Sequence, residues 1–248
     1  MENKLKDKLE SNENTIGCFV NFYSPSLVEI IGYSGYDFVV IDDEHGAFAT
    51  PDLTEMIRAA KVTGITPIVR VSYNASSIQK ALDQGAAGIQ VPMVNNADDA
   101  RNVVTKAKYP PFGTRGVAYS IPSAKYGKLN GRKYLNQANK NVIIVVHIET
   151  EEAVKNFEEI ISVPEIDIAF IGTADLAVDM GYDDAHHEAV QETVALLFEK
   201  AKQYDIKMGL VASSQDGVTA AFEQGASYAS VVANKVITNA LKKLATIR

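Results

Sequence analysis

Several apolar runs of the sequence end in residues that can bind a metal, carry a proton or hold an anion. These runs are VVIDDEHG, PIVRV, VIIVVHIET and IAFIGTADLA, and the polar residues at their ends are Asp42, Glu44, His45, Arg70, His147, Glu149 and Asp175. Carboxylates suit Mg²⁺ or Mn²⁺, imidazole titrates near neutral pH, and guanidinium groups bind carboxylates. The combination indicates metal-assisted acid–base chemistry on an anionic substrate.

Each of these residues also has a simpler interpretation. Glu149 and Asp175 are the expected ligands of a divalent metal, but acids are equally common at the starts of helices. Arg70 ends a buried run and needs a carboxylate, either from a substrate or from the protein itself, because isolated buried charge is costly. His45 follows Glu44 directly, which favours a general base over a purely structural histidine.

The elements that would position these residues repeat along the chain. Short runs rich in Val and Ile alternate with segments of helical period, as in successive βα units of a parallel sheet. The expected strands are Ile16–Asn21, Phe38–Glu44, Thr66–Val71, Gly88–Val94, Val142–Glu149, Ile166–Gly172, Lys207–Ser213 and Tyr228–Ala233. Eight strands predict a (β/α)8 TIM barrel, whose strand ends all meet at one mouth. A doubly wound sheet would need a Gly-rich phosphate-binding first turn, and IGCFVNFYSPS has none.

Helical spacing predicts the elements that cover the strands. The expected helices are 51–63, 75–84, 96–107, 150–162, 186–204 and 214–224, with an extra N-terminal helix at the barrel bottom and a final helix in 233–248. The segment from Tyr109 to Asn141 is rich in Gly, Pro and Tyr and is predicted to be a long functional loop.

Length and composition agree with one enzyme domain over residues 1–248. The net charge of -7 is spread along the chain, which argues against nucleic-acid or membrane binding. The N-terminus MENKLKDKLESNENT lacks an apolar signal-peptide stretch, no run is long enough to span a membrane, and the single cysteine, Cys18, can form no internal disulfide. We therefore expect a cytoplasmic protein.

Six segments together resemble the HpcH/HpaI aldolase family, over nearly the whole chain. They are YDFVVIDDEHG, PIVRV, ALDQGAAGIQVPMV, YPPFGTRGVA, HIETEEA and FIGTADLAVDMGY, in the family's order and at similar spacing. The resemblance implies a phosphoenolpyruvate/pyruvate-type TIM barrel and a divalent-metal-dependent aldolase. Its members act on 4-hydroxy-2-oxo acids and 2-oxo-3-deoxy sugar acids, which they cleave reversibly to pyruvate and an aldehyde.

The resemblance also implies roles for individual residues. His45 falls on the family's base, Arg70 on its enolate-stabilising arginine, and Glu149 and Asp175 on the ligands of Mg²⁺, Mn²⁺ or Co²⁺. Asp83 falls on the aspartate that makes this histidine more basic. As a hypothesis for the mechanism, beyond the resemblance, Asp42 would also orient His45. The backbone amides of Gly172, Thr173 and Ala174 would hold the substrate carboxylate.

Three residues depart from the family's pattern. Asp43 replaces a glycine, His147 replaces a glutamine and Thr173 replaces a proline. His147 is expected to contact the substrate in place of the glutamine or to become an additional metal ligand. These departures leave the identity of the substrate and the preferred metal open.

Alternatives to this aldolase remain at the level of the sequence. A lysine Schiff base is disfavoured because no lysine considered lies at the C-terminal end of a strand. Lys207 lies at the start of its strand, the opposite end of the barrel. The others lie on expected helices (Lys61, Lys80, Lys106, Lys155 and Lys202) or in the long segment (Lys125 and Lys128). A citrate-lyase-like or citrate-synthase-like condensation enzyme uses the same fold, and a non-catalytic 2-oxo acid binding protein is a third interpretation. The family resemblance further implies a hexamer whose dimers exchange the final helix. Phe48 and Tyr119 would either shape the acceptor pocket or form local cores.

Overall fold

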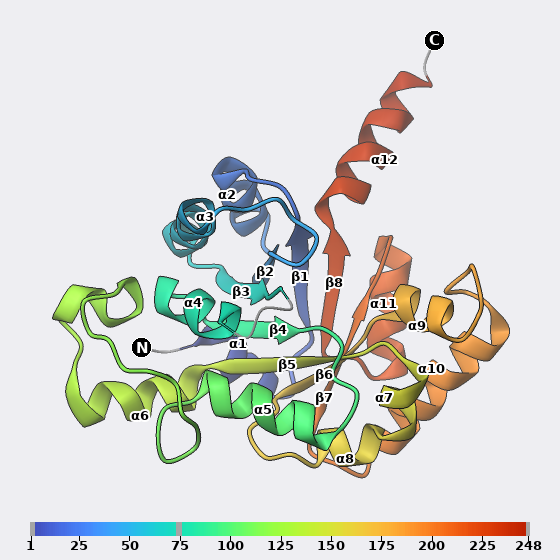
Figure 1. Ribbon diagram of the computed structural model, residues 1–248. Coiled ribbons are helices and arrows are strands. Elements are labelled where there is room, and N and C mark those ends of the chain that lie inside the picture. Colours follow the sequence, from blue (N-terminus) through green and yellow to red (C-terminus); the bar gives the residue numbers. More distant parts are fainter. Residues whose placement is uncertain (1–2, 73–75, 247–248) are drawn as a thin grey trace.

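The computed structural model describes residues 3–72 and 76–246, which form a closed barrel of parallel strands (Figure 1). Each strand pairs with the next along the chain, and β8 pairs with β1 to close the barrel. The strands are β1 (Thr15–Val20), β2 (Phe38–Asp42), β3 (Thr66–Arg70), β4 (Gly88–Val91), β5 (Ile143–Ile148), β6 (Ile168–Ile171), β7 (Lys207–Val211) and β8 (Tyr228–Val232). The predicted (β/α)8 barrel is confirmed, and each strand ends between one and three residues earlier than predicted.

The helices lie around this barrel. They are α1 (Lys4–Glu10), α2 (Pro25–Tyr33), α3 (Thr50–Thr63), α4 (Ser77–Gln84), α5 (Ala97–Ala107), η1 (Pro122–Gly127), α6 (Gly131–Asn141), α7 (Glu151–Lys155), α8 (Phe157–Ile161), α9 (Thr173–Asp179), α10 (Glu188–Ala201), α11 (Gln215–Gln224) and α12 (Ala233–Ala245). The predicted start of the fourth helix at residue 75 and the chain end at 247–248 lie outside the described residues.

Alternation along the strands divides the core into two layers. Residues such as Val40, Ile68 and Val145 belong to one buried cluster, which fills the barrel interior. Their neighbours on the strands, such as Val39 and Val69, belong to a larger cluster shared with the surrounding helices. Leu5 and Leu9 of α1 join the interior cluster, so the N-terminal helix closes the barrel bottom, as predicted.

Several helices differ from the prediction. The segment from Tyr109 to Asn141 is not one loop, because its last third is helix α6 and it also contains the short helix η1. The predicted helix 150–162 is divided at Asn156 into α7 and α8. Helix α2 was not predicted, and α9 was expected only as a helix of unstated range after residues 172–174. Ser24 and Pro25 nevertheless form a normal helix start, with the Ser24 side chain accepting a hydrogen bond from Leu27 N–H.

The segment from Tyr109 to Asn141 has a small core of its own, to which α6 contributes. Tyr109, Ala124 and Tyr134 are buried together, and Tyr119 packs edge-on against Tyr134 with ring centroids 6.2 Å apart. The aromatic side chain of Phe48 packs against the main core. Of the two interpretations of Phe48 and Tyr119, the structural one therefore agrees with their contacts.

Two further features concern the surface and the single thiol. Cys18 is buried, and this burial raises the pKa of its thiol to about 12, so the thiolate is scarce at neutral pH. Helix α12 projects away from the barrel (Figure 1). None of the helices in residues 3–72 and 76–246 is long and apolar enough to cross a membrane.

Candidate active site

A cavity of about 690 Å³ opens at the C-terminal mouth of the barrel. The predicted site residues that line it are Asp42, His45, Arg70, His147, Glu149, Gly172, Thr173, Ala174 and Asp175. They come from the ends of β2, β3, β5 and β6, which the closed barrel brings to one edge. Active sites of TIM barrels form at this edge.

Arg70, the last residue of β3, is the cation at the centre of a group of acids. Its Nε and Nη2 donate to the two carboxylate oxygens of Asp42 at 2.8 and 2.6 Å, and its Nη1 lies 3.1 Å from Glu44 Oε2. The register places Asp42 directly beside Arg70 on neighbouring strands. Burial alone would lower the pKa of Arg70, but the hydrogen bonds and charge of Asp42 and the charge of Glu44 raise it above its usual value. Arg70 is therefore a permanent cation with protein partners already in place.

His45 lies in the turn after β2, beside this group. Its backbone N–H donates to Asp42 Oδ1 at 3.3 Å, and its Nε2 lies 3.8 Å from Glu44 Oε2. The side chain of His45 is 60% exposed, so its ring can be reached by a ligand in the cavity. Burial raises the pKa of Glu44, whereas the charge of Arg70 lowers it, and the net pKa is above the usual value.

Glu149 directly follows β5 and is buried at the cavity wall. Met93 N–H donates to its Oε1 at 2.6 Å, and His147 Nδ1 lies 2.8 Å from its Oε2. Burial would raise the pKa of Glu149, but the hydrogen bond and charge of His147 and the Met93 amide leave it below the usual value. Glu149 precedes Thr150, the N-cap of α7, so it is not the helix-start acid of the alternative interpretation. The backbone also comes close here, since a Cβ at Gly172 would lie 2.7 Å from Glu149 Oε2.

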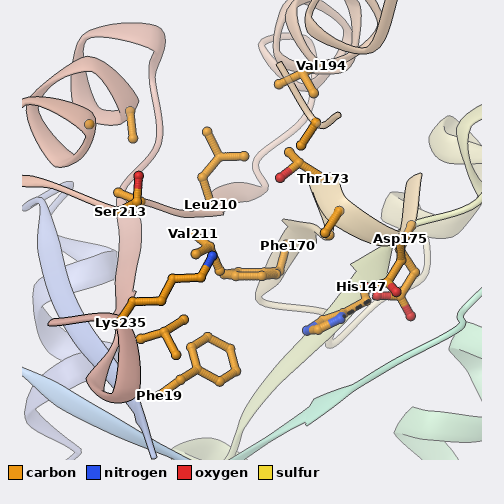
Figure 2. A pocket seen from close by; sticks show the side chains of 18 of the residues that line it. Phe19, His147, Phe170, Thr173, Asp175, Val194, Leu210, Val211, Ser213 and Lys235 are labelled. Atoms are coloured by element: carbon orange, nitrogen blue, oxygen red, sulfur yellow. Dashed lines mark hydrogen bonds and ion pairs between the residues drawn. The ribbon is translucent and has the colours of Figure 1, made fainter. Parts of the chain in front are cut away.

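The turn after β6 supplies the other predicted contacts. Asp175 lies in the first turn of α9 and is exposed, and its side chain lines the cavity (Figure 2). Gly172 N–H donates to Ile148 C=O at 3.1 Å, so it is already used within the barrel. The amides of Thr173 and Ala174 begin α9 and have no acceptor within the helix. They are the better donors for an anion.

The donor set at the mouth fits a hard divalent cation. Glu149 and Asp175 both line the cavity, the low pKa of Glu149 keeps it ionised, and each of its oxygens retains a second lone pair after its hydrogen bond. In the described part of the chain, no group of three or more His, Cys, Asp or Glu side chains is arranged to hold a metal. Two carboxylates with the other positions open to water or substrate are typical of Mg²⁺ sites rather than of zinc sites.

Asp83 does not line this cavity with the other predicted residues. It lies on α4, where its Oδ1 accepts a hydrogen bond from Arg115 Nη2 at 2.6 Å. Arg115 is itself buried, and its guanidinium lies 4.6 Å above the Tyr109 ring. Asp83 thus ties α4 to the segment after α5.

Other residues of the cavity had no clear signal in the sequence. The side of the cavity away from His147 and Asp175 carries Leu210, Val211 and Lys235, and Figure 2 shows Lys235 extending into it from α12. Phe19 also lines the cavity, but its ring lies against Arg70, whose guanidinium carbon is 5.2 Å from the ring centroid. No lysine was considered well placed for this mouth, so Lys235 corrects that expectation. Gln90, Phe170 and Tyr228, which support His147 from the barrel interior, were also missed because their strands read as ordinary apolar core.

The family follows from comparison with known proteins. The family model described as HpcH/HpaI aldolase/citrate lyase matches residues 15–238. The chain belongs to this family. The predicted membership is confirmed, and with it a lyase that acts on carbon–carbon bonds.

Two characterised relatives of this HpcH/HpaI protein are aldolases. The 2-dehydro-3,6-dideoxy-6-sulfogluconate aldolase of Pseudomonas putida is 35% identical over 91% of this chain and 89% of its own length. The 2-keto-3-deoxy-L-rhamnonate aldolase of Escherichia coli is 33% identical over 93% of this chain and 87% of its own length.

Solved structures agree with the fold. A HpcH/HpaI aldolase/citrate lyase family protein from Burkholderia cenocepacia superposes with a TM-score of 0.93 at 30% identity, covering 98% of both chains. The citrate synthase SbnG superposes with a TM-score of 0.87 at 29% identity, covering 98% of this chain and 96% of its own.

Proposed function

We propose that this protein is a divalent-metal-dependent aldolase that reversibly cleaves a 2-oxo-3-deoxy sugar acid or another 4-hydroxy-2-oxo acid to pyruvate and an aldehyde. The observation that supports this proposal most is a single cavity at the barrel mouth. It is lined by two carboxylates, those of Glu149 and Asp175, together with Arg70 and His45. The two aldolase relatives, both named for 2-oxo-3-deoxy acids, support the same class of substrate.

Glu149 and Asp175 would hold the cation, which is Mg²⁺, Mn²⁺ or Co²⁺. When bound there, a divalent ion supplies Lewis-acid stabilisation of negative charge on the 2-oxo oxygen. The amides of Thr173 and Ala174, with Gly172 as the turn that presents them, would bind the substrate carboxylate. These contacts would orient the bond between C3 and C4 toward His45.

His45 would move the proton in the cleavage step. It takes the proton of the C4 hydroxyl, the C3–C4 bond breaks, and the electron pair left on C3 delocalises onto the 2-oxo oxygen while C4 leaves as an aldehyde. Asp42 would orient His45 through its backbone contact. Asp83 is proposed as a second acid that orients His45. Because Asp83 pairs with Arg115, it would act on His45 indirectly, through the segment around Arg115. Arg70 would offset the developing negative charge, and His45 would then return the proton it has taken up to C3, which completes pyruvate.

The aldehyde would occupy the other end of the cavity. Leu210 and Val211 give this end an apolar wall, and Lys235 gives it a cation. An aldehyde with a distal anionic group matches this combination, because the ammonium of Lys235 would pair with the anion.

A pyruvate-release assay coupled to lactate dehydrogenase tests the proposal. Metal-stripped protein is given 2-oxo-3-deoxy sugar acids and 4-hydroxy-2-oxo acids with Mg²⁺, Mn²⁺ or Co²⁺. We expect release that depends on the added metal, is abolished by EDTA, and falls about 10²–10⁴-fold in kcat in His45→Ala. Activity that survives chelation would refute the metal-dependent mechanism.

Lys235 makes the Schiff-base mechanism a specific rival in this assay. Borohydride trapping in the presence of pyruvate should fail if the metal-dependent proposal is right. Covalent labelling that disappears in Lys235→Met would instead establish Lys235 as an amine nucleophile.

A second candidate function is the condensation of oxaloacetate with an acyl-CoA. The likeness to the citrate synthase SbnG favours it, together with the altered mouth at Asp43 and His147. Product formation from oxaloacetate and an acyl-CoA, without pyruvate release from any member of the sugar-acid panel, would favour this function over the aldolase. Absence of product in both assays would favour the non-catalytic 2-oxo acid binding protein.

The environment of the enzyme is also part of the proposal. We infer a cytoplasmic homo-oligomer, with a hexamer as the form that the family resemblance implies, and residues 1–248 as one domain. The exposed apolar side chains of α12 support association: Val236, Ile237, Leu241 and Leu244 are 48%, 38%, 61% and 67% exposed. Such a stripe on a projecting helix needs a partner surface.

A further inference from the structure

His147 is buried and contacts protein partners at both ring nitrogens and on one face of its ring. It is 1% exposed, Nδ1 lies 2.8 Å from Glu149 Oε2, and Nε2 lies 2.7 Å from Gln90 Nε2. Its ring stacks on Phe170, at 4.9 Å between centroids and 25° between planes. Both ring nitrogens are therefore occupied by protein, and the stack fixes the plane of the ring.

The contacts continue into the barrel interior from β5 to β4 and across to β8. Tyr228 donates its hydroxyl hydrogen to Gln90 Oε1 at 3.3 Å, and both residues are fully buried. Tyr228 also meets Phe170 edge-on, with ring centroids 6.1 Å apart. Four residues, Tyr228, Gln90, His147 and Glu149, thus form one hydrogen-bonded chain from the core to the cavity wall.

The amide group of Gln90 determines the direction of the hydrogen bonds along this series of residues. An amide nitrogen can only donate, so His147 Nε2 accepts from Gln90 Nε2–H, and the ring hydrogen on Nδ1 is donated to Glu149 Oε2. Gln90 Nε2–H then donates to the ring, its oxygen faces Tyr228, and the Tyr228 hydroxyl donates to that oxygen. These directions are compatible with one another, because each of the three hydrogen bonds has one donor and one acceptor.

We propose that Tyr228, Gln90 and His147 are positioning residues, which hold Glu149 in one orientation through a single ring tautomer of His147. This inference rests on the proposed role of Glu149 as a cation ligand. His147 Nδ1–H and Met93 N–H each donate to one oxygen of Glu149, at 2.8 and 2.6 Å, which restricts rotation of the carboxylate at the wall of the cavity. His147 in this role neither ligates the cation nor binds the substrate through its nitrogens.

The tautomer can be measured on the metal-free protein. The chain contains four histidines, so a ¹⁵N-labelled sample gives few ring signals, and those of His147 are assigned by their loss in His147→Asn. We expect a protonated Nδ1 and an unprotonated Nε2. A hydrogen on Nε2, alone or together with one on Nδ1, would overturn the proposal. This measurement requires neither metal nor activity.

The effect on the cation site is measured by Mn²⁺ titration followed by electron paramagnetic resonance. Gln90→Met keeps the volume but removes the donor to Nε2, and we expect it to weaken the Mn²⁺ Kd about 10-fold. His147→Leu removes the donor to Glu149 and should weaken it about 10–100-fold, whereas His147→Asn places an amide N–H near the position of Nδ1 and should restore part of that loss.

Val145→Ala is the matched control. Val145 is fully buried, faces the same barrel interior two residues before His147, and pairs in register with Gln90. Its truncation should lower thermal stability but leave the Mn²⁺ Kd unchanged. Equal losses of Mn²⁺ affinity in Gln90→Met and Val145→Ala would overturn the proposal, as would a wild-type protein that binds no Mn²⁺. If the tautomer and the Mn²⁺ pattern are as expected but no pyruvate is released, only the proposed aldolase function fails.

Discussion

Arg70 shows how one residue can satisfy two interpretations of the sequence. Its position at a strand end indicated either a substrate contact or a structural ion pair. The structure gives it protein partners, Asp42 and Glu44, and also places it in the wall of the cavity. These partners hold the guanidinium in a fixed orientation, which is what a charge-stabilising group requires. The sequence predicted the residue but not its partners, because the register of β2 against β3 is a property of the folded barrel.

Replacing Arg70 with methionine should therefore affect stability as well as activity. The Asp42 side chain is 4% exposed and would lose both of its guanidinium hydrogen bonds. We expect the free energy of unfolding in urea to fall by about 3–5 kcal/mol, because a buried charge is left without its partner. Arg101→Met is the control: Arg101 and Asp98 form an ion pair on the surface, with side chains 60% and 89% exposed, and its loss should cost less than about 1 kcal/mol. Similar losses in the two variants would show that the Arg70 pair is not effectively buried.

At the scale of elements, strands were easier to predict than helices. Runs such as VIIVVHI are buried on both faces in a barrel and therefore appear as continuous apolar sequence. Helix α6 was missed because only Tyr134 and Asn139 are buried on it, so its sequence, GRKYLNQANKN, lacks a full apolar face. Likewise, the hydrogen bonds that link Tyr228, Gln90, His147 and Glu149 join residues of three strands. No local sequence pattern reveals a contact such as that of Tyr228 with Gln90, which lie 138 positions apart.

The pairing of Asp83 with Arg115 is an element-scale contact that can be tested as one. It joins α4 to the segment that follows α5, and the two side chains are 15% and 4% exposed. We expect Asp83→Asn and Arg115→Met each to destabilise the protein, and the double variant to lose less than the sum. A coupling energy of about 0.5–3 kcal/mol should result from a double-mutant cycle of urea unfolding. Additive losses would mean that the two side chains do not stabilise the protein through their contact.

At the scale of the whole molecule, the closed barrel leaves one element without cover. Only Ala233 of α12 is buried, and its apolar side chains Val236, Leu241 and Leu244 face away from any described partner in this chain. We expect the 26.9 kDa protein to elute as an oligomer in size-exclusion chromatography with light scattering, and Leu241→Glu with Leu244→Glu to shift it toward 26.9 kDa. Charges at these positions are unfavourable at an apolar interface but harmless on a solvated helix. Leu196→Glu, at an exposed apolar position on α10 (51% exposed), is the control and should leave the mass unchanged. A wild-type monomer would contradict the expectation, and loss of pyruvate release together with dissociation would indicate that neighbouring subunits complete or stabilise the cavity in which Lys235 of α12 lies.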